Sequence, residues 1–403
     1  MKKFENLISR EAYIAKIQPF INTNIIKVLV GHRRVGKSYI LFQIMDLIKK
    51  NNAQANIIYI DKENFEFDFI KDYVQLHEYV QSKLKTDVKN YIFVDEIQMI
   101  TDFHIAIRSL ALDENNDIYI TGSNSEMLAS DVANQLGGRY IEFTIYSLSY
   151  LEFLQFHNLE NSDESLEKYM HYGGLPYLKN LPFEQEIMYE YLKSIYATII
   201  LKDVVQRKNI RNSLFLEQLV KFLADTGGGL FSTKSISDYL KSQKEMVSTN
   251  QVNEYIRALT SAFVIHSVGR YDIAGKRNFE IGEKHYFENL GIRNIVGGYK
   301  PQDKAKRLEN VVYNHLVFSG YAVKVGTIYS NEIDFVCERN GEKLYVQVTI
   351  ELSREDTIER EFGNLLKIKD NYPKIVVSGE RSFENSYEGV RHVYIRDFLT
   401  SIA

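Results

Sequence analysis

The sequence is poor in the residues that mark a secreted or membrane-spanning protein. Its 403 residues include one cysteine, Cys337, only five prolines and no tryptophan. A single cysteine excludes an internal disulfide and any metal site built from several cysteines, and it fits a reducing compartment. No apolar run approaches the ~18 residues of a membrane span, and no apolar stretch follows the basic N-terminus. We therefore expect a cytoplasmic protein without membrane contact.

The chain also lacks a strong excess of charge of either sign. It has 49 lysines and arginines against 53 aspartates and glutamates, which gives a net charge of −4. This balance excludes a wholly basic nucleic-acid coat but leaves room for a local basic patch. Hydrophobic residues make up 45% of the chain, and at about 150 residues per domain the length suggests two or three globular domains.

The first 145 residues alternate between short apolar runs rich in β-formers and segments with helical periodicity. The apolar runs lie at 25–30, 56–60, 91–94, 117–120 and 140–145. Strands separated by crossovers of helical length are typical of a parallel sheet with helices on both faces. The predicted fold class of this region is therefore α/β.

A glycine-rich loop follows the first of these runs and precedes a helical segment. Residues 31–38 read GHRRVGKS and satisfy the pattern G-x-x-x-x-G-K-[ST]. The loop amides and the helix N-terminus would hold phosphates, Lys37 would neutralise the β- and γ-phosphates, and the Ser38 hydroxyl would bind Mg²⁺. The nucleotide-binding residues that we predict are Gly31, Arg34, Val35, Gly36, Lys37, Ser38 and Tyr39.

Two later strands end in polar residues that complete this site. Asp95 and Glu96 follow the apolar run 91–94, where Asp95 would hold the magnesium and Glu96 would deprotonate the attacking water. Asn124 follows the next run and would either contact the γ-phosphate or cap a helix. An acid after the magnesium aspartate and an intervening strand indicate an ATPase with an additional catalytic strand. Since no Asn-Lys-x-Asp base reader is found, ATP is preferred to GTP.

Several motifs together resemble a prokaryotic family of AAA+-type ATPases with a C-terminal region of unknown function. They are GHRRVGKS, YIFVDEIQ, ITGSNSEML, LGGRYIEF, YSLSYLEFL, YGGLP, HYFENLGIRN and EIDFVCERNGEKLYVQVT. The resemblance implies ATP binding and hydrolysis but names no substrate. Arg139 matches the arginine of the family, which would approach the γ-phosphate in cis, or in trans from a neighbouring subunit, unless it pairs with a surface acid.

Residues 212–284 resemble a winged helix, with a third helix at 248–263. The charge of this segment argues against a DNA reader, because eight lysines and arginines face seven acids. We favour a structural or protein-docking role over DNA contact. The residues that would reach bases are Thr249, Asn250, Asn253 and Arg257.

The last section resembles the PD-(D/E)xK nuclease fold. Glu309 and Asp334 occupy the first two metal-binding positions of that motif. Gln347 stands where an acid is expected and Thr349 where a lysine is expected, so a charged ligand and a cation are missing. We predict an inactive site, although Glu332 shares a strand face with Asp334 and would be placed to restore metal binding.

The predicted domains are a P-loop ATPase at 1–146, a helical lid or linker at 147–211, a winged helix at 212–284 and a nuclease-like domain at 285–403. Lys202, Arg207, Lys208 and Arg211 in the second region would close over nucleotide or form a solvated helix face. We predict a Mg²⁺-dependent ATPase that couples nucleotide state to its appended modules, and that forms homo-oligomers if Arg139 acts in trans. The alternatives are an ATP-dependent switch acting on a partner protein without DNA contact, and an ATP-gated DNA-binding factor or active nuclease.

Overall fold

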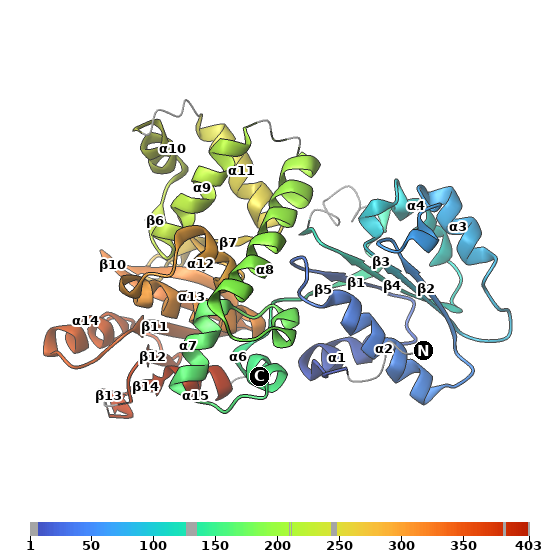
Figure 1. The fold of residues 1–403 in the computed structure, drawn as a ribbon. Coiled ribbons are helices and arrows are strands. Elements are labelled where there is room, and N and C mark those ends of the chain that lie inside the picture. The colour runs from blue at the N-terminus through green and yellow to red at the C-terminus, as the bar shows by residue number, and fades with distance from the viewer. Residues whose placement is uncertain are drawn as a thin grey trace. The chain divides into compact units, whose positions relative to one another are not determined.

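The chain forms two compact units in a computed structural model (Figure 1). The first comprises residues 1–146 and 261–263, and the second comprises 147–260 and 264–403. The structure describes residues 7–125, 135–208, 210, 212–242, 248–381 and 384–401, and leaves undescribed the side chains of 240–242 and 277–281.

A parallel sheet forms the centre of the first unit. Its strands are β1 (Ile26–Val30), β2 (Asn56–Asp61), β3 (Asn90–Asp95), β4 (Asn116–Gly122) and β5 (Tyr140–Thr144). They lie in the order β2-β3-β4-β1-β5, and every neighbouring pair is parallel. Strand β4 lies between β1, which leads into the glycine-rich loop, and β3, which carries the acids. The predicted P-loop NTPase fold class is therefore confirmed.

Helices cover both faces of this sheet. Figure 1 shows α1 (Glu11–Ile17) and α2 (Lys37–Asn51) on one side, and α3 (Tyr73–Gln81) and α4 (Phe103–Leu110) on the other. Every residue of β1, β3 and β4 is buried, as expected for central strands of a sheet covered on both faces. The carboxyl ends of β1, β3 and β4 consequently meet at one edge, where α/β sheets place their ligands.

The second unit begins with helices. They are α6 (Tyr150–His157), α7 (Asp163–Tyr172), α8 (Gln185–Thr198) with its π-helical continuation η7 (Ile199–Gln206), α9 (Ser213–Thr226), α10 (Thr233–Ser242) and α11 (Thr249–Ser261). Ser149 and Glu152 form a capping box that fixes the start of α6. Among the described residues no helix is both long and apolar enough to cross a membrane.

A mixed sheet runs through the rest of this unit. Its order is β13-β14-β12-β11-β10-β9-β7-β8-β6. The strands are β6 (Leu230–Phe231), β7 (Ile265–Asp272), β8 (Arg277–Phe287), β9 (Ala322–Ile328), β10 (Asn331–Arg339), β11 (Glu342–Thr349), β12 (Lys374–Ser378), β13 (Ser386–Tyr387) and β14 (Val390–Tyr394). The helices between and after them are α12 (Leu290–Gly297), α13 (Lys304–Phe318), α14 (Glu355–Leu366) and α15 (Ile395–Ser401).

The predicted boundary between residues 284 and 285 falls inside a strand. Residues on both sides of it belong to β8, which pairs with β7 in an antiparallel hairpin. The other edge of β7 pairs in parallel with β9, so that Arg270 lies opposite Val325. The hairpin of the predicted winged helix is therefore part of the C-terminal sheet, because the other edge of β7 pairs with β9, a strand that follows the hairpin in the chain.

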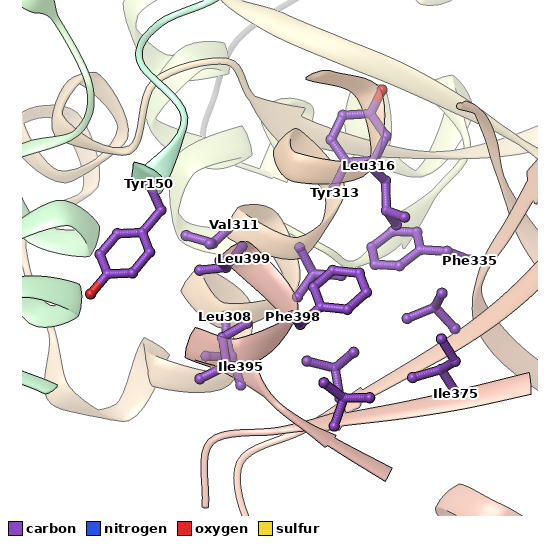
Figure 2. Close-up of a cluster of buried hydrophobic side chains, with 14 of the residues drawn as sticks. Tyr150, Leu308, Val311, Tyr313, Leu316, Phe335, Ile375, Ile395, Phe398 and Leu399 are labelled. Carbon is purple, nitrogen blue, oxygen red and sulfur yellow. The ribbon is translucent and has the colours of Figure 1, made fainter. Parts of the chain in front are cut away.

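The core of the second unit lies between α13, α15 and the sheet (Figure 2). Tyr150 from α6 belongs to the same buried cluster as Phe335 from β10 and Ile375 from β12. The helices supply the remaining labelled side chains, Leu308, Val311, Tyr313, Leu316, Ile395, Phe398 and Leu399. The segment predicted as a lid or linker thus shares a hydrophobic core with the C-terminal region.

Candidate nucleotide-binding site

Two glycines give the loop between β1 and α2 its shape. Gly31 has φ 153°, and a Cβ built on it would lie 2.1 Å from the carbonyl oxygen of Ile145. Gly36 has φ 97° and precedes the first residue of α2. A side chain at Gly31 would collide with backbone, and one at Gly36 would be strained, so the pattern of glycines reflects backbone requirements.

Lys37 begins α2 and folds back across this loop. Its buried Nζ donates hydrogen bonds to the carbonyl oxygens of Gly31 and His32, each at 3.0 Å. The same atom lies 3.8 Å from Oε1 of Glu96. A buried ammonium group therefore lies beside the N-terminus of a helix, and both favour an anion.

Asp95 is buried at the end of β3 and receives hydrogen bonds from neighbouring hydroxyl groups. Burial raises the pKa of Asp95, and hydrogen bonds from Ser38 and Thr121 oppose this rise. Thr121 lies 2.5 Å from Oδ1, and the Tyr59 hydroxyl donates to Oδ2 at 3.2 Å. The structure thus brings the predicted magnesium residues, Ser38 and Asp95, into contact. Their hydroxyl and carboxylate oxygens are the ligand type that Mg²⁺ prefers, so this donor set fits the ion.

Glu96 has a left-handed backbone, with φ 54°. Its N–H donates to Oγ1 of Thr121 at 3.0 Å, and its Oε2 accepts from Gln98 at 2.5 Å. Gln98 also donates to the Ser123 hydroxyl at 3.2 Å. A non-glycine residue in this conformation is uncommon and is held here by its neighbours.

Thr121 and Gln98 position the two acids, but the sequence analysis did not assign roles to them. Thr121 donates to Asp95 and accepts from Glu96, so it ties the end of β3 to β4. The sequence signal that could have identified Thr121 is a polar residue at the end of a strand in a nucleotide-binding sheet. Asn124, which we singled out from the same stretch, is buried just beyond the carboxyl end of β4.

The remaining predicted nucleotide-binding side chains lie at the edge of the loop. Arg34 is exposed with φ 69°, and Tyr39 is exposed and contacts Phe42 edge to face. Val35 is buried, and its carbonyl oxygen accepts a hydrogen bond from Arg10. The described geometry therefore gives Val35 a backbone role and leaves Arg34 and Tyr39 on the surface.

Arg139 lies at the amino-terminal end of β5, whereas the phosphate loop follows the carboxyl-terminal end of β1. Arg139 precedes β5, whose parallel register places Tyr140 opposite Ile26 and Thr144 opposite Val30. At about 3.3 Å per residue, the run from Arg139 to Ile145 spans roughly 20 Å, farther than an arginine side chain reaches. The predicted approach in cis is therefore wrong for this arrangement. The register of β5, which decides this distance, could not be read from spacing in the sequence. An approach in trans stays a prediction.

In the second unit the structure gathers the predicted nuclease-like residues. The backbone N–H of Asp334 donates to Oε1 of Gln347 at 3.3 Å, and Oδ2 of Asp334 accepts from the N–H of Val348 at 2.8 Å. Glu309 lies close enough to raise the pKa of Asp334, which burial raises most. Thr349 instead donates its hydroxyl to the carbonyl of Glu351.

A lysine that the sequence analysis passed over lies in the middle of this group. Nζ of Lys284, on β8, is 2.8 Å from Glu309, 2.7 Å from Glu332 and 3.9 Å from Asp334. Burial alone would lower the pKa of Lys284, but these carboxylates raise it above its usual value. The expectation that this site lacks a lysine is therefore wrong for the folded structure, in which Lys284 lies among the acids. It holds for the sequence motif, because position 349 is a threonine. Among the described residues, no group of three or more acidic, histidine or cysteine side chains is arranged to hold a metal ion.

The residues expected to read DNA lie on the solvent side of α11. Thr249, Asn250, Asn253 and Arg257 are exposed, whereas the apolar residues of the same helix are buried. Asn253 accepts a hydrogen bond from Thr233 at 2.7 Å. Of the earlier basic run, Lys202 and Lys208 are exposed, Arg207 lies 3.9 Å from Asp203, and Arg211 lies outside the described residues.

The matches to known proteins include the first unit and extend over almost the whole chain. Residues 23–154 match the AAA domain family, and residues 163–303 match a domain of unknown function, DUF8612. An uncharacterized protein of Haemophilus influenzae is 35% identical over 401 residues, covering 98% of both chains. Uncharacterized protein MJ1544 of Methanocaldococcus jannaschii is 28% identical, covering 94% of this chain and 90% of its own.

Solved structures show only a distant likeness. The Orc1 protein of Aeropyrum pernix in complex with DNA has a TM-score of 0.34 and 12% identity, covering 72% of this chain and 93% of its own. AMPPCP-bound DnaA from Aquifex aeolicus has a TM-score of 0.32 and 14% identity, covering 63% of this chain and 89% of its own. At such scores nothing about function follows from them. The glycine-rich loop, the parallel sheet and the near full-length match instead lead to one conclusion: the chain belongs to the family of the Haemophilus influenzae protein, and its first unit has a P-loop NTPase fold that matches the AAA domain family.

Proposed function

We propose that the protein binds ATP with Mg²⁺ at the loop between β1 and α2 and hydrolyses it. One observation carries the proposal. Lys37 and Ser38 on α2 meet Asp95 and Glu96 at the carboxyl end of β3, and Thr121 on β4 joins the two acids. A cation for phosphate, oxygen ligands for a metal and a carboxylate for water are thus supplied at one sheet edge.

Each group has a separate role in this proposal. Lys37 exchanges its hydrogen bonds to loop carbonyls for the β- and γ-phosphates. Ser38 and Asp95 hold Mg²⁺, which would neutralise the charge that develops on the phosphates. Glu96 accepts the proton of the attacking water, and Gln98 keeps its carboxylate in place. Asn124 contacts the γ-phosphate. Arg139 lies at the amino-terminal end of β5, too far from the phosphate loop to act within its own chain, so in this proposal it acts in trans from a second copy and the active form is a homo-oligomer.

We propose that the second unit contacts a partner in response to the nucleotide state of the first unit. The exposed polar face of α11 would contact a partner, and the balanced charge of residues 212–284 favours a protein over DNA. The Lys284 cluster argues against a nuclease, because the carboxylates that would bind a metal already neutralise an ammonium group. An ATP-gated DNA-binding factor is the alternative, and salt-sensitive DNA binding would favour it.

The test separates nucleotide binding from chemistry. In Glu96→Gln the amide still positions water but cannot accept its proton, so single-turnover hydrolysis should fall by about 10²–10⁴-fold. MgATP affinity should change little. Glu63→Gln, an exposed acid that pairs with Arg33, is the matched control and should hydrolyse ATP at the parental rate. Equal rates for Glu96→Gln and the parent would remove Glu96 from the proposed role.

A further inference from the structure

Arg10, just before α1, holds two distant pieces of backbone together in the first unit. Its guanidinium donates from Nη1 to the carbonyl of Val35 in the phosphate loop and to the carbonyl of Tyr146, both at 3.0 Å. The side chain is buried and lies 4.6 Å from the ring centroid of Tyr13. Its own N–H donates to Gln43 of α2 at 3.1 Å. One residue thus links the phosphate loop, the helix after it and Tyr146, the last residue before the chain enters the second unit.

Residues 145 and 146, beside the phosphate loop, are hydrogen-bonded to residues of the first unit. The N–H of Ile145 donates to Val30 at 2.7 Å, and its carbonyl lies against Gly31. The N–H of Tyr146 donates to the Tyr13 hydroxyl at 3.0 Å. Both ends of the phosphate loop, Gly31 and Val35, are therefore connected to residues 145–146.

The next two residues, Ser147 and Leu148, are hydrogen-bonded to residues of the second unit. The N–H of Ser147 donates to Oε1 of Glu288 at 2.5 Å, and its hydroxyl donates to Oε2 at 2.9 Å. The N–H of Leu148 donates to the carbonyl of Gly174 at 2.7 Å. A Cβ on Gly174 would lie 2.5 Å from the Leu148 carbonyl oxygen, so this contact needs glycine. The motifs YSLSY, YGGLP and YFENLG, for which the ATPase site gives no role, thus meet around residues 147–148.

We propose that Arg10 is a positioning residue that couples the phosphate loop to the peptide between Tyr146 and Ser147, and so passes nucleotide occupancy to the second unit. The inference rests on the proposed ATP binding. Nucleotide that moves Val35 displaces an acceptor of Arg10, and the other acceptor, Tyr146, is one bond from a residue anchored in the second unit. Four consecutive backbone N–H groups, 145 to 148, are hydrogen-bonded, the first two within the first unit and the last two within the second.

The experiment is hydrogen exchange by mass spectrometry on the full chain, with and without MgATP. In the parent, MgATP should change exchange of the amides of Ser147 and Leu148 by roughly five- to tenfold, the low end of ordinary coupling between sites. Arg10→Ala should bind MgATP within about threefold of the parent but lose this effect, since Lys37 and the loop glycines are untouched. Arg10→Lys should keep part of it, because an ammonium can donate to both carbonyls as Nη1 does but lies on a shorter and more flexible side chain. Arg108→Ala, an exposed arginine of α4, is the matched control and should keep all of it.

The outcomes separate the two proposals. A parent that binds no MgATP would overturn the proposed function. A parent that binds MgATP without any change at residues 147–148 would overturn only the coupling, as would Arg10→Ala with the parental change. If Arg10→Ala does not fold, as judged by exchange of β3 and β4, Tyr13→Phe removes the hydroxyl that accepts the Tyr146 N–H and should weaken the same effect. A full effect in Tyr13→Phe would then count against the inference.

Discussion

Each unit of this protein contains a buried lysine beside carboxylates, but the two sites differ in what else surrounds the amino group. Lys37 has one carboxylate at 3.8 Å, two loop carbonyls and a helix N-terminus. Lys284 has Glu309 and Glu332 within 2.8 Å and a third acid at 3.9 Å, and the Tyr286 hydroxyl also donates to Glu309. The first lysine can turn toward an added anion, whereas the second is already neutralised. We infer that the groups around each lysine separate the two roles, with Lys37 placed to bind a ligand and Lys284 to stabilise the fold.

Removal of each lysine should give opposite results in two assays. Lys37→Ala should weaken MgATP binding by at least about 100-fold, since Lys37 is the ammonium group that the proposal assigns to the phosphates, while the unfolding transitions change little. Calorimetry and chemical denaturation are the measurements. Lys50→Ala, an exposed lysine of the same helix, is the matched control. Unchanged affinity in Lys37→Ala would remove the basis of the comparison.

Lys284→Met should leave MgATP binding unchanged but lower the free energy of unfolding of the second unit by about 3 kcal/mol, because it leaves the buried Asp334 and the half-buried Glu309 without a cation. Lys193→Met breaks an exposed pair with Glu190 and should cost less than about 1 kcal/mol. A cost for Lys284→Met as small as that of Lys193→Met would show that the cluster does not stabilise the fold.

The parent should not cut linear, supercoiled or branched DNA with Mg²⁺ or Mn²⁺, with or without ATP. Gln347 is neutral, and the neighbouring acids are bound to Lys284. Gln347→Glu combined with Thr349→Lys restores the missing motif groups and should raise Mn²⁺ affinity by about tenfold even without cleavage. Cutting that disappears in Asp334→Ala would contradict this account, and an unchanged Mn²⁺ affinity in the double variant would show that these positions do not form a nuclease-like site.

The second unit should also lose stability in acid. Burial lowers the pKa of His285 and His315 to about 4, and neither ring nitrogen of His315 has a hydrogen-bond partner among the described residues. Because the pKa in the unfolded chain is about 6.5, the unfolded state takes up protons first as pH falls. Stability is full above pH 6.5 and is lost toward pH 4, by about 2 kcal/mol per histidine at pH 5.

Denaturation curves at pH 7.5 and 5 test this pH dependence, and His315→Phe should make it shallower. His77→Phe, in the first unit, should leave the slope of the second unit unchanged. If the second unit is equally stable at both pH values, the buried histidines do not remain neutral in the way described.

The features that sequence predicted well depend on short stretches of chain. The strands of the first unit, the phosphate loop and the acids after β3 follow from local apolar runs and from glycines whose backbone requires them. The features it missed depend on residues far apart in the chain. Arg10 contacts backbone 25 and 136 residues away, and Lys284 reaches Glu332 across strands that pair only in the folded sheet. The misplacement of Arg139 has the same origin, since a one-dimensional spacing does not give the register of β5.

The most direct test of the account is a calorimetric titration of ATP into the full chain, with Mg²⁺ and with excess chelator. The contact between Ser38 and Asp95, beside Lys37, predicts a saturable site whose affinity for ATP falls at least about tenfold without the ion. Absence of saturable binding with Mg²⁺, or the same affinity with and without it, would contradict the proposal that these residues form a magnesium–nucleotide site.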